Sequence, residues 1–181
     1  MRRRTLLIFA LIFVALLTAL LVQNRQLEEV PPPTRPVTFF RTFPDLALVN
    51  IQAIRLQDTE SDQAFIISRD AEGNWIAPGS EGELDTEAAV SIARTIVLLP
   101  YLRTFDLEAD ADLATYGFQP TPIMLIEVLL VDGSAHVIAV GRRTPAETGF
   151  YALIDDRPEM YLLGLEAVTY LIAQLNTPPV A

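Results

Sequence analysis

The feature that most constrains this chain is an apolar run over residues 5–22, TLLIFALIFVALLTALLV, which carries no charge. As an α-helix rising 1.5 Å per residue it would be about 27 Å long, close to the hydrocarbon thickness of a bilayer. Three arginines precede the run, and Glu28 and Glu29 lie beyond it. The positive-inside rule then places the N-terminus in the cytoplasm. We therefore expect basic residues and a transmembrane helix over 1–24, in a single-pass protein of the cell membrane whose C-terminal domain is extracytoplasmic.

A cleaved signal peptide is the alternative interpretation of the same residues. Signal peptides share the basic start, but they have a shorter apolar region and a small-x-small cleavage site. Here the apolar run is longer than that, and the stretch TALLVQNRQ that closes it contains no A-x-A. We therefore expect a retained anchor.

Composition excludes several classes of chemistry. The chain has no cysteine, so disulfides and thiolate metal sites are absent. All 13 basic residues are arginine, and the lack of lysine excludes Ser-Lys dyads, Schiff bases and P-loops. Beyond residue 30, nine arginines face 21 acidic residues, a net charge of about −12. This charge disfavours nucleic acid and anionic bilayer surfaces as partners.

Residues 25–38 contain the proline-rich stretch EEVPPPTRP and are expected to form a stiff, extended stalk. An α+β domain is expected over residues 39–177, followed by a short tail at 178–181. In its first half, alternating apolar residues predict strands over 49–56, with a bulge, and over 64–69 and 75–76. A helix is expected over 85–99, capped by Asp85 and ended by Pro100.

The second half is expected to begin with a strand over 103–107 and a turn of helix at 113–116. Asp132-Gly133 is a strong hairpin signal between strands 123–131 and 135–140. Strands 150–154 and 160–163 form a second hairpin, and a final helix covers 165–175. Each half is thus a strand meander followed by a helix, which predicts helices packed on an antiparallel sheet.

No constellation of residues indicates catalysis. Ser134 and His136 lie two apart on one strand and loosely resemble a nucleophile and a base, but catalytic triads draw on separate elements. With a single histidine and no cysteine, a zinc site is disfavoured. The acidic stretch at 106–112 lacks the glycine and glutamate of a calcium loop, so a solvated loop is preferred, with weak calcium binding as the alternative. We predict no enzyme activity, no cofactor and no metal.

The stretch GRRTPAETGFY, which starts at Gly141, is interpreted as a strand end, a loop and a new strand beginning at Gly149. It lacks the successive glycines of a phosphate nest. Four residues remain as candidate contacts for a partner or ligand. The arginines could grip an anionic group, although exposed arginines are commoner, and the aromatic rings could stack on a sugar, although Trp75 fits a core position better. The candidates are Trp75, Arg142, Arg143 and Tyr151.

An ordered set of motifs resembles the bacterial family called domain of unknown function 4340. The motifs are W-x-x-P at Trp75, YGFQP at Tyr116, V-G-x-x-T-P at Val140, and the segments FYALI and MYLL at 150–154 and 160–163. The likeness covers about residues 45–175. It implies a membrane-anchored, extracytoplasmic α+β domain, in some members accompanying ABC-type transport systems, and it carries over no catalytic residues.

The sequence therefore predicts a non-enzymatic, membrane-anchored envelope protein whose outer domain binds a protein partner, such as the membrane part of an ABC-type transport system. The alternative prediction is an extracytoplasmic module that binds a small ligand or glycan.

Overall fold

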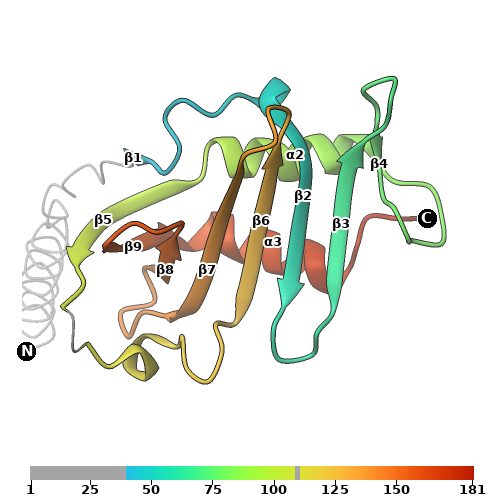
Figure 1. The fold of residues 1–181 in the computed structure, drawn as a ribbon. Coiled ribbons are helices and arrows are strands. Elements are labelled where there is room, and N and C mark those ends of the chain that lie inside the picture. The colour runs from blue at the N-terminus through green and yellow to red at the C-terminus, as the bar shows by residue number, and fades with distance from the viewer. Residues whose placement is uncertain (1–39, 109–110) are drawn as a thin grey trace, which may run out of the picture. The chain divides into compact units, whose positions relative to one another are not determined.

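The computed structural model describes residues 40–108 and 111–181. They form one antiparallel sheet of nine strands in the order β1-β5-β9-β8-β7-β6-β2-β3-β4 (Figure 1). The predicted anchor and stalk lie outside the described residues, and no helix within them is long and apolar enough to span a membrane. The strands are β1 (Phe40–Arg41), β2 (Ile51–Asp58), β3 (Ala64–Arg69), β4 (Trp75–Ile76), β5 (Pro100–Asp106), β6 (Met124–Leu130), β7 (Ala135–Arg143), β8 (Gly149–Ile154) and β9 (Glu159–Gly164).

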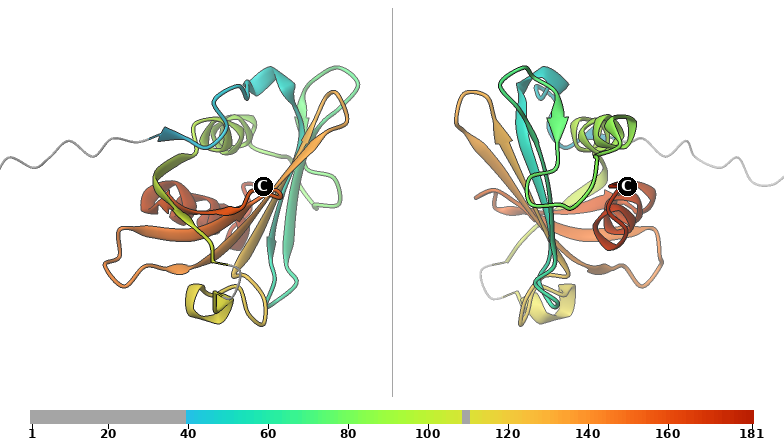
Figure 2. Two further views of the ribbon diagram at one scale, coloured as in Figure 1. Left: turned by 60° about the vertical axis from the view of Figure 1, so that its left-hand side comes forward. Right: turned by 90° about the vertical axis from the view of Figure 1, so that its right-hand side faces the viewer.

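Two helices, α2 (Thr86–Val97) and α3 (Leu165–Asn176), cover one face of this sheet (Figure 2). The helix α2 begins where predicted, because the Asp85 carboxylate accepts the N–H groups of Glu87 and Ala88. Its apolar stripe packs with that of α3 on the inward side chains of the sheet in a single core. Fully buried members of this core include Ile54, Ile92, Ile126, Ile138 and Leu171.

The local elements follow the predicted turns. Gly133 takes φ +85° between β6 and β7, a conformation that glycine adopts without strain. The second hairpin joins β8 to β9, and β2 carries the expected bulge, between Ile51 and Ala53. The residues before that bulge differ from the prediction, since Leu48–Asn50 form the 3₁₀ helix η1. The prediction of helices on an antiparallel sheet is confirmed.

Four long-range pairings go beyond the sequence prediction. The strand β5 pairs with β9. The strand β6 pairs with β2, which joins the two meanders in one sheet. The short strand β1 adds to the edge of β5. The C-terminal residues, expected to be a tail, join the fold instead: Val180 bridges Leu84, and Ala181 exchanges backbone hydrogen bonds with Glu83.

A segment between β5 and β6 covers part of the other face of the sheet. It contains the 3₁₀ helix η2 (Leu113–Tyr116), which ends at Gly117 with φ +82°. Phe118 is buried here against Gly141, where a Cβ atom would come within 2.9 Å of the Phe118 ring. Met160 and Leu162 are also buried outside the main core. Within residues 40–108 and 111–181, no element covers the rest of that face, over β2, β3, β6, β7 and the end of β8.

Candidate functional site

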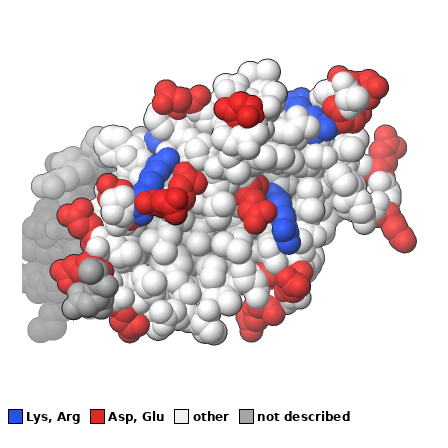
Figure 3. Space-filling model, in the orientation of Figure 1, with Lys and Arg blue, Asp and Glu red and all other residues white. Residues whose placement is uncertain are grey.

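The first candidate site is the part of the sheet that no described element covers, which we call the open face. Its side chains alternate with the core residues of five strands, so they point away from the helices. Apolar side chains dominate it, and most of this side of the molecule is formed by uncharged residues (Figure 3). The open face consists of Ala53, Arg55, Ile66, Leu125, Glu127, Leu129, Val137, Ala139 and Leu153.

The apolar character of the open face is strongest near the β6–β7 turn. Leu129 is 43% exposed and Val137 is 42% exposed, on neighbouring strands. Val131 and Val49 extend this surface and are 63% and 74% exposed; they lie together because the Val131 N–H donates to the Asn50 carbonyl. Clustered exposed side chains of this kind mark interaction surfaces, whereas single ones need no explanation.

Charge on the open face is paired at its centre and negative at its margin. Arg55 on β2 lies 3.7 Å from Glu127 on β6, and both side chains are about two-fifths exposed. The Arg55 Nε is buried and has no hydrogen-bond partner among the described residues. At the margin, hydrogen bonds favour the ionised form of two carboxylates: the Glu60 N–H lowers the pKa of Asp58, and the Ser134 hydroxyl lowers the pKa of Asp132.

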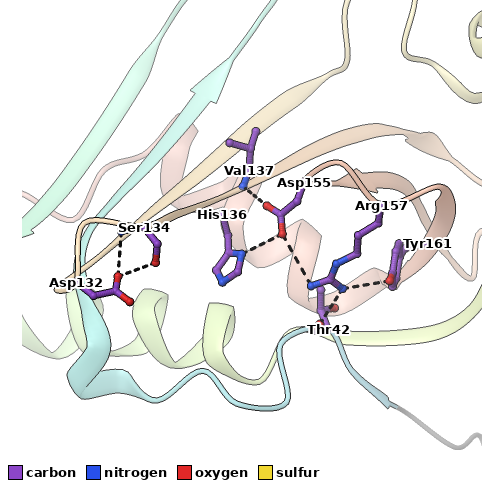
Figure 4. Close-up of polar contacts among 8 residues, drawn as sticks. All are labelled: Thr42, Asp132, Ser134, His136, Val137, Asp155, Arg157 and Tyr161. Carbon is purple, nitrogen blue, oxygen red and sulfur yellow. Dashed lines mark hydrogen bonds and ion pairs between the residues drawn. The ribbon is translucent and has the colours of Figure 1, made fainter.

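A second candidate site is a polar cluster at the β8–β9 turn (Figure 4). Asp155 accepts hydrogen bonds from the Val137 N–H at 2.8 Å and pairs with His136 Nδ1 at 2.9 Å. Arg157 lies 3.8 Å from the same carboxylate and donates to the Thr42 carbonyl and the Tyr161 hydroxyl. The cluster thereby ties the chain after β1 to the end of the sheet.

The polar cluster does not arrange a nucleophile and a base. The Ser134 hydroxyl donates to the Asp132 carboxylate at 2.6 Å, and no hydrogen bond between described residues joins it to His136 (Figure 4). The Phe43 ring lies against the imidazole, with centroids 4.4 Å apart. Apart from the Thr42 hydroxyl, which is buried without a hydrogen-bond partner among the described residues, the groups of the cluster named above hold backbone or another side chain. Its geometry is that of a structural network.

The four residues singled out from the sequence do not come together in one site. Trp75 is 6% exposed in the core, and the Arg69 guanidinium lies 4.4 Å from its ring centroid. Arg143 at the end of β7 lies 5.5 Å from the Phe150 ring, and Arg142 packs beside Gly117. Residues 141–149 form the strand end, loop and strand start that the sequence predicted.

Tyr151 lines a hollow of about 460 Å³ between β5, β8, β9 and the segment containing η2. Its ring meets that of Tyr116 edge to face at 5.0 Å. Phe105 and Met160 add apolar surface, and the Arg103 guanidinium lies 4.5 Å from the Phe105 ring centroid. Sequence reasoning named Tyr151 as a contact but used Tyr116 only in a motif of the family resemblance and in a predicted turn of helix.

Among the described residues, no group of three or more acidic or histidine side chains is placed to hold a metal ion. Asp110, in the acidic stretch considered for calcium, lies outside them. No family model, curated protein or solved structure matches this chain.

Proposed function

We propose that the domain is a non-enzymatic binding module that docks a protein partner on its open face. The observation that carries this proposal is the exposed apolar cluster of Leu129, Val131 and Val137 on a sheet whose two helices both lie on the other side. A sheet face of this kind needs a covering layer to complete its burial. The polar cluster and the separated Ser134 and His136 give no support to an enzyme.

Charge selects the kind of partner. The outer part of the chain carries about −12 net charge, and acidic groups line the margin of the open face (Figure 3). A second copy of this chain, or an anionic bilayer, would bring like charge to that margin. The occupant that fits is a different protein with an apolar centre and arginine or lysine side chains around it.

We further propose that the chain is anchored in the membrane by residues 5–22 and that the partner belongs to the envelope, for example a membrane subunit of an ABC-type transport system. The apolar run and the family resemblance support this placement. Protease added outside spheroplasts should digest the domain, while the protein stays in the membrane fraction. A freely soluble protein with a trimmed N-terminus would contradict the anchor.

Site-specific photocrosslinking in intact cells tests the docking surface. A photoreactive residue at Val137 should give a crosslink to another protein, and the same residue at Leu98 should not. Leu98 is a matched control because it is 51% exposed on the helix layer. With the photoreactive residue at position 129 instead, Val137→Glu should abolish the crosslink to the partner, whereas Leu98→Glu should leave it unchanged. Equal products from both positions, no product, or a crosslink to a second copy would contradict the proposal.

A second candidate function is the binding of a small polyhydroxylated ligand at the hollow beside Tyr151. The edge-to-face pair of Tyr116 and Tyr151 offers an apolar surface, and Arg103 and Asp106 offer hydrogen-bonding groups of both charges. Aromatic surface with a few polar groups is typical of ligand sites. Titration with a panel of simple sugars, observed through chemical shifts of Tyr116 and Tyr151, would decide it: shifts lost in Tyr151→Ala support the site, and no shifts refute it.

A further inference from the structure

The outer edge of β3 is only half covered by its neighbour. The strand runs over Ala64–Arg69, but β4 pairs with its last two residues alone, Ser68 and Arg69. On its other side β3 pairs with β2 along its length, from Ala64 to Ser68. The first half of β3 is therefore an edge of the whole sheet.

Two hydrogen bonds fix which backbone groups point outward at this edge. The Asp58 N–H donates to the Gln63 carbonyl at 2.8 Å, and the Asp70 N–H donates to the Asn74 carbonyl at 3.0 Å. Because bonding alternates along an antiparallel strand, Phe65 and Ile67 turn their backbone groups toward β2. Ala64 and Ile66 then turn theirs outward, where no described residue bonds to them.

The neighbouring strand cannot extend to cover these groups. In the β3–β4 register the next outward pair would place Pro78 opposite Ile66, and proline has no N–H to donate. The chain turns away instead, with the Ser80 N–H bonded to the Ala77 carbonyl. The right-hand view of Figure 2 looks onto this side of the molecule, and the lower half of β3 has no other ribbon in front of it.

This edge is short, but it lacks several other features by which proteins protect exposed strands. The stretch AFII from Ala64 to Ile67 has no charge, no proline and no bulge. Phe65 and Ile67 are buried in the core, so they hold the strand rigid, while Ala64 is exposed. A rigid, apolar, unprotected edge is a template for another strand.

We propose that the edge of β3 is a strand-addition site that accepts an extended segment of a protein partner. The free N–H and C=O groups of Ala64 and Ile66 would bond to it. Acidic residues flank the edge at both turns, Glu60 and Asp62 below and Glu72 above, so the segment carries basic residues at its ends. Charge disfavours a second copy. In a two-fold symmetric pairing of two β3 edges, Ala64 of one copy lies opposite Ile66 of the other. This register places Glu60 opposite the second copy's Asp70, so that two carboxylates face each other.

Amide hydrogen exchange measured by NMR tests this site with a defined probe, the peptide RVTVTVR. In the free protein the amides of Ala64 and Ile66 should exchange fast and those of Phe65 and Ile67 slowly. Saturating peptide should slow exchange at Ala64 and Ile66 by at least about tenfold. The same peptide with alternate amides N-methylated should not bind, because it lacks the donors on one side.

A pair of variants at one position isolates the backbone group. Ala64→Pro removes an outward N–H at the first residue of an edge strand, a position where proline is tolerated. It should weaken peptide binding by about tenfold or more, while Ala64→Val, which keeps the N–H, should bind like wild type. Circular dichroism verifies that both variants fold.

Several outcomes would overturn the strand-addition site. Slow exchange of Ala64 and Ile66 without peptide would mean that the edge is already covered, and slowing that grows with protein concentration would identify a second copy as the occupant. Equal binding of the N-methylated peptide, or of Ala64→Pro, would exclude backbone pairing. Crosslinking from Val137 does not depend on any of these results, so the open-face proposal can stand or fall separately.

Discussion

The contribution of the Asp155 side chain to the free energy of unfolding can be worked out from its contacts. Asp155 takes the left-handed conformation, φ +50°, in the β8–β9 turn, and its carboxylate holds the Val137 N–H and His136. Asp155→Ala adds a backbone cost of about 1 kcal/mol, because alanine tolerates this conformation poorly. It also removes two hydrogen bonds worth about 1 kcal/mol each. We therefore expect the free energy of unfolding to fall by about 3 kcal/mol.

Two further substitutions separate these contributions. Asp155→Gly relieves the backbone conformation but loses both hydrogen bonds, so the expected loss is about 2 kcal/mol. Asp155→Asn keeps an acceptor for the Val137 N–H and tolerates the left-handed region, so the loss should be below about 1 kcal/mol. The neighbouring Asp156→Ala is the control, expected within about 0.5 kcal/mol of wild type as a surface change.

Urea unfolding of the purified protein, followed by fluorescence, measures these differences. Trp75 is the only tryptophan and is buried, so its emission reports on the core. The expected order of stability is wild type, Asn, Gly, Ala. If Asp155→Ala were as stable as Asp156→Ala, the polar cluster would contribute nothing to the fold and the reasoning from its hydrogen bonds would be refuted.

Three other changes test the fold in the same unfolding assay. Ile126→Ala empties a fully buried position of β6 and should cost about 2–5 kcal/mol; a loss below about 1 kcal/mol would contradict its place in the core. Gly141→Ala should cost about 1–3 kcal/mol, because the added methyl meets the Phe118 ring and the Tyr116 carbonyl oxygen. The Asn74 N–H lowers the pKa of Asp70 below its usual 3.8, so Asp70 stabilises the fold above that pH and loses this effect as the pH falls through the lowered pKa. Asp70→Asn should therefore differ from wild type at neutral pH more than well below pH 3.8, and an equal difference at both would contradict the assignment.

Local patterns in the sequence predicted the elements well where the turn chemistry is explicit. Asp132-Gly133 marks its hairpin because only glycine takes the required backbone conformation without strain. Asp85 marks the start of α2 because its carboxylate caps the first turn. The pairing of β6 with β2 has no such signal, since it joins residues far apart in the chain. Such pairings are decided by which faces fit together in the core.

The candidate sites were less visible from the sequence than the fold. His136 was noticed, but its partner Asp155 lies 19 residues away and is brought to it by the β7–β8 register. One pattern in the sequence does indicate the open face. The strand β6 reads MLIEVLL, with apolar residues on both faces of the strand, which is typical of a strand buried on both faces. Two predicted helices suffice to cover one face only. An apolar strand with too few helices to cover it is therefore the signal in the sequence that could have revealed the open face.

The order of the strands sets how far apart the two ends of the sheet are. The chain enters at β1, and β3 stands seven places along the order from it. Neighbouring strands lie about 4.8 Å apart, so the path along the twisted sheet from Phe40 to the free edge is roughly 34 Å long. A segment captured by β3 would therefore extend the sheet on the side opposite to the one where the described chain begins.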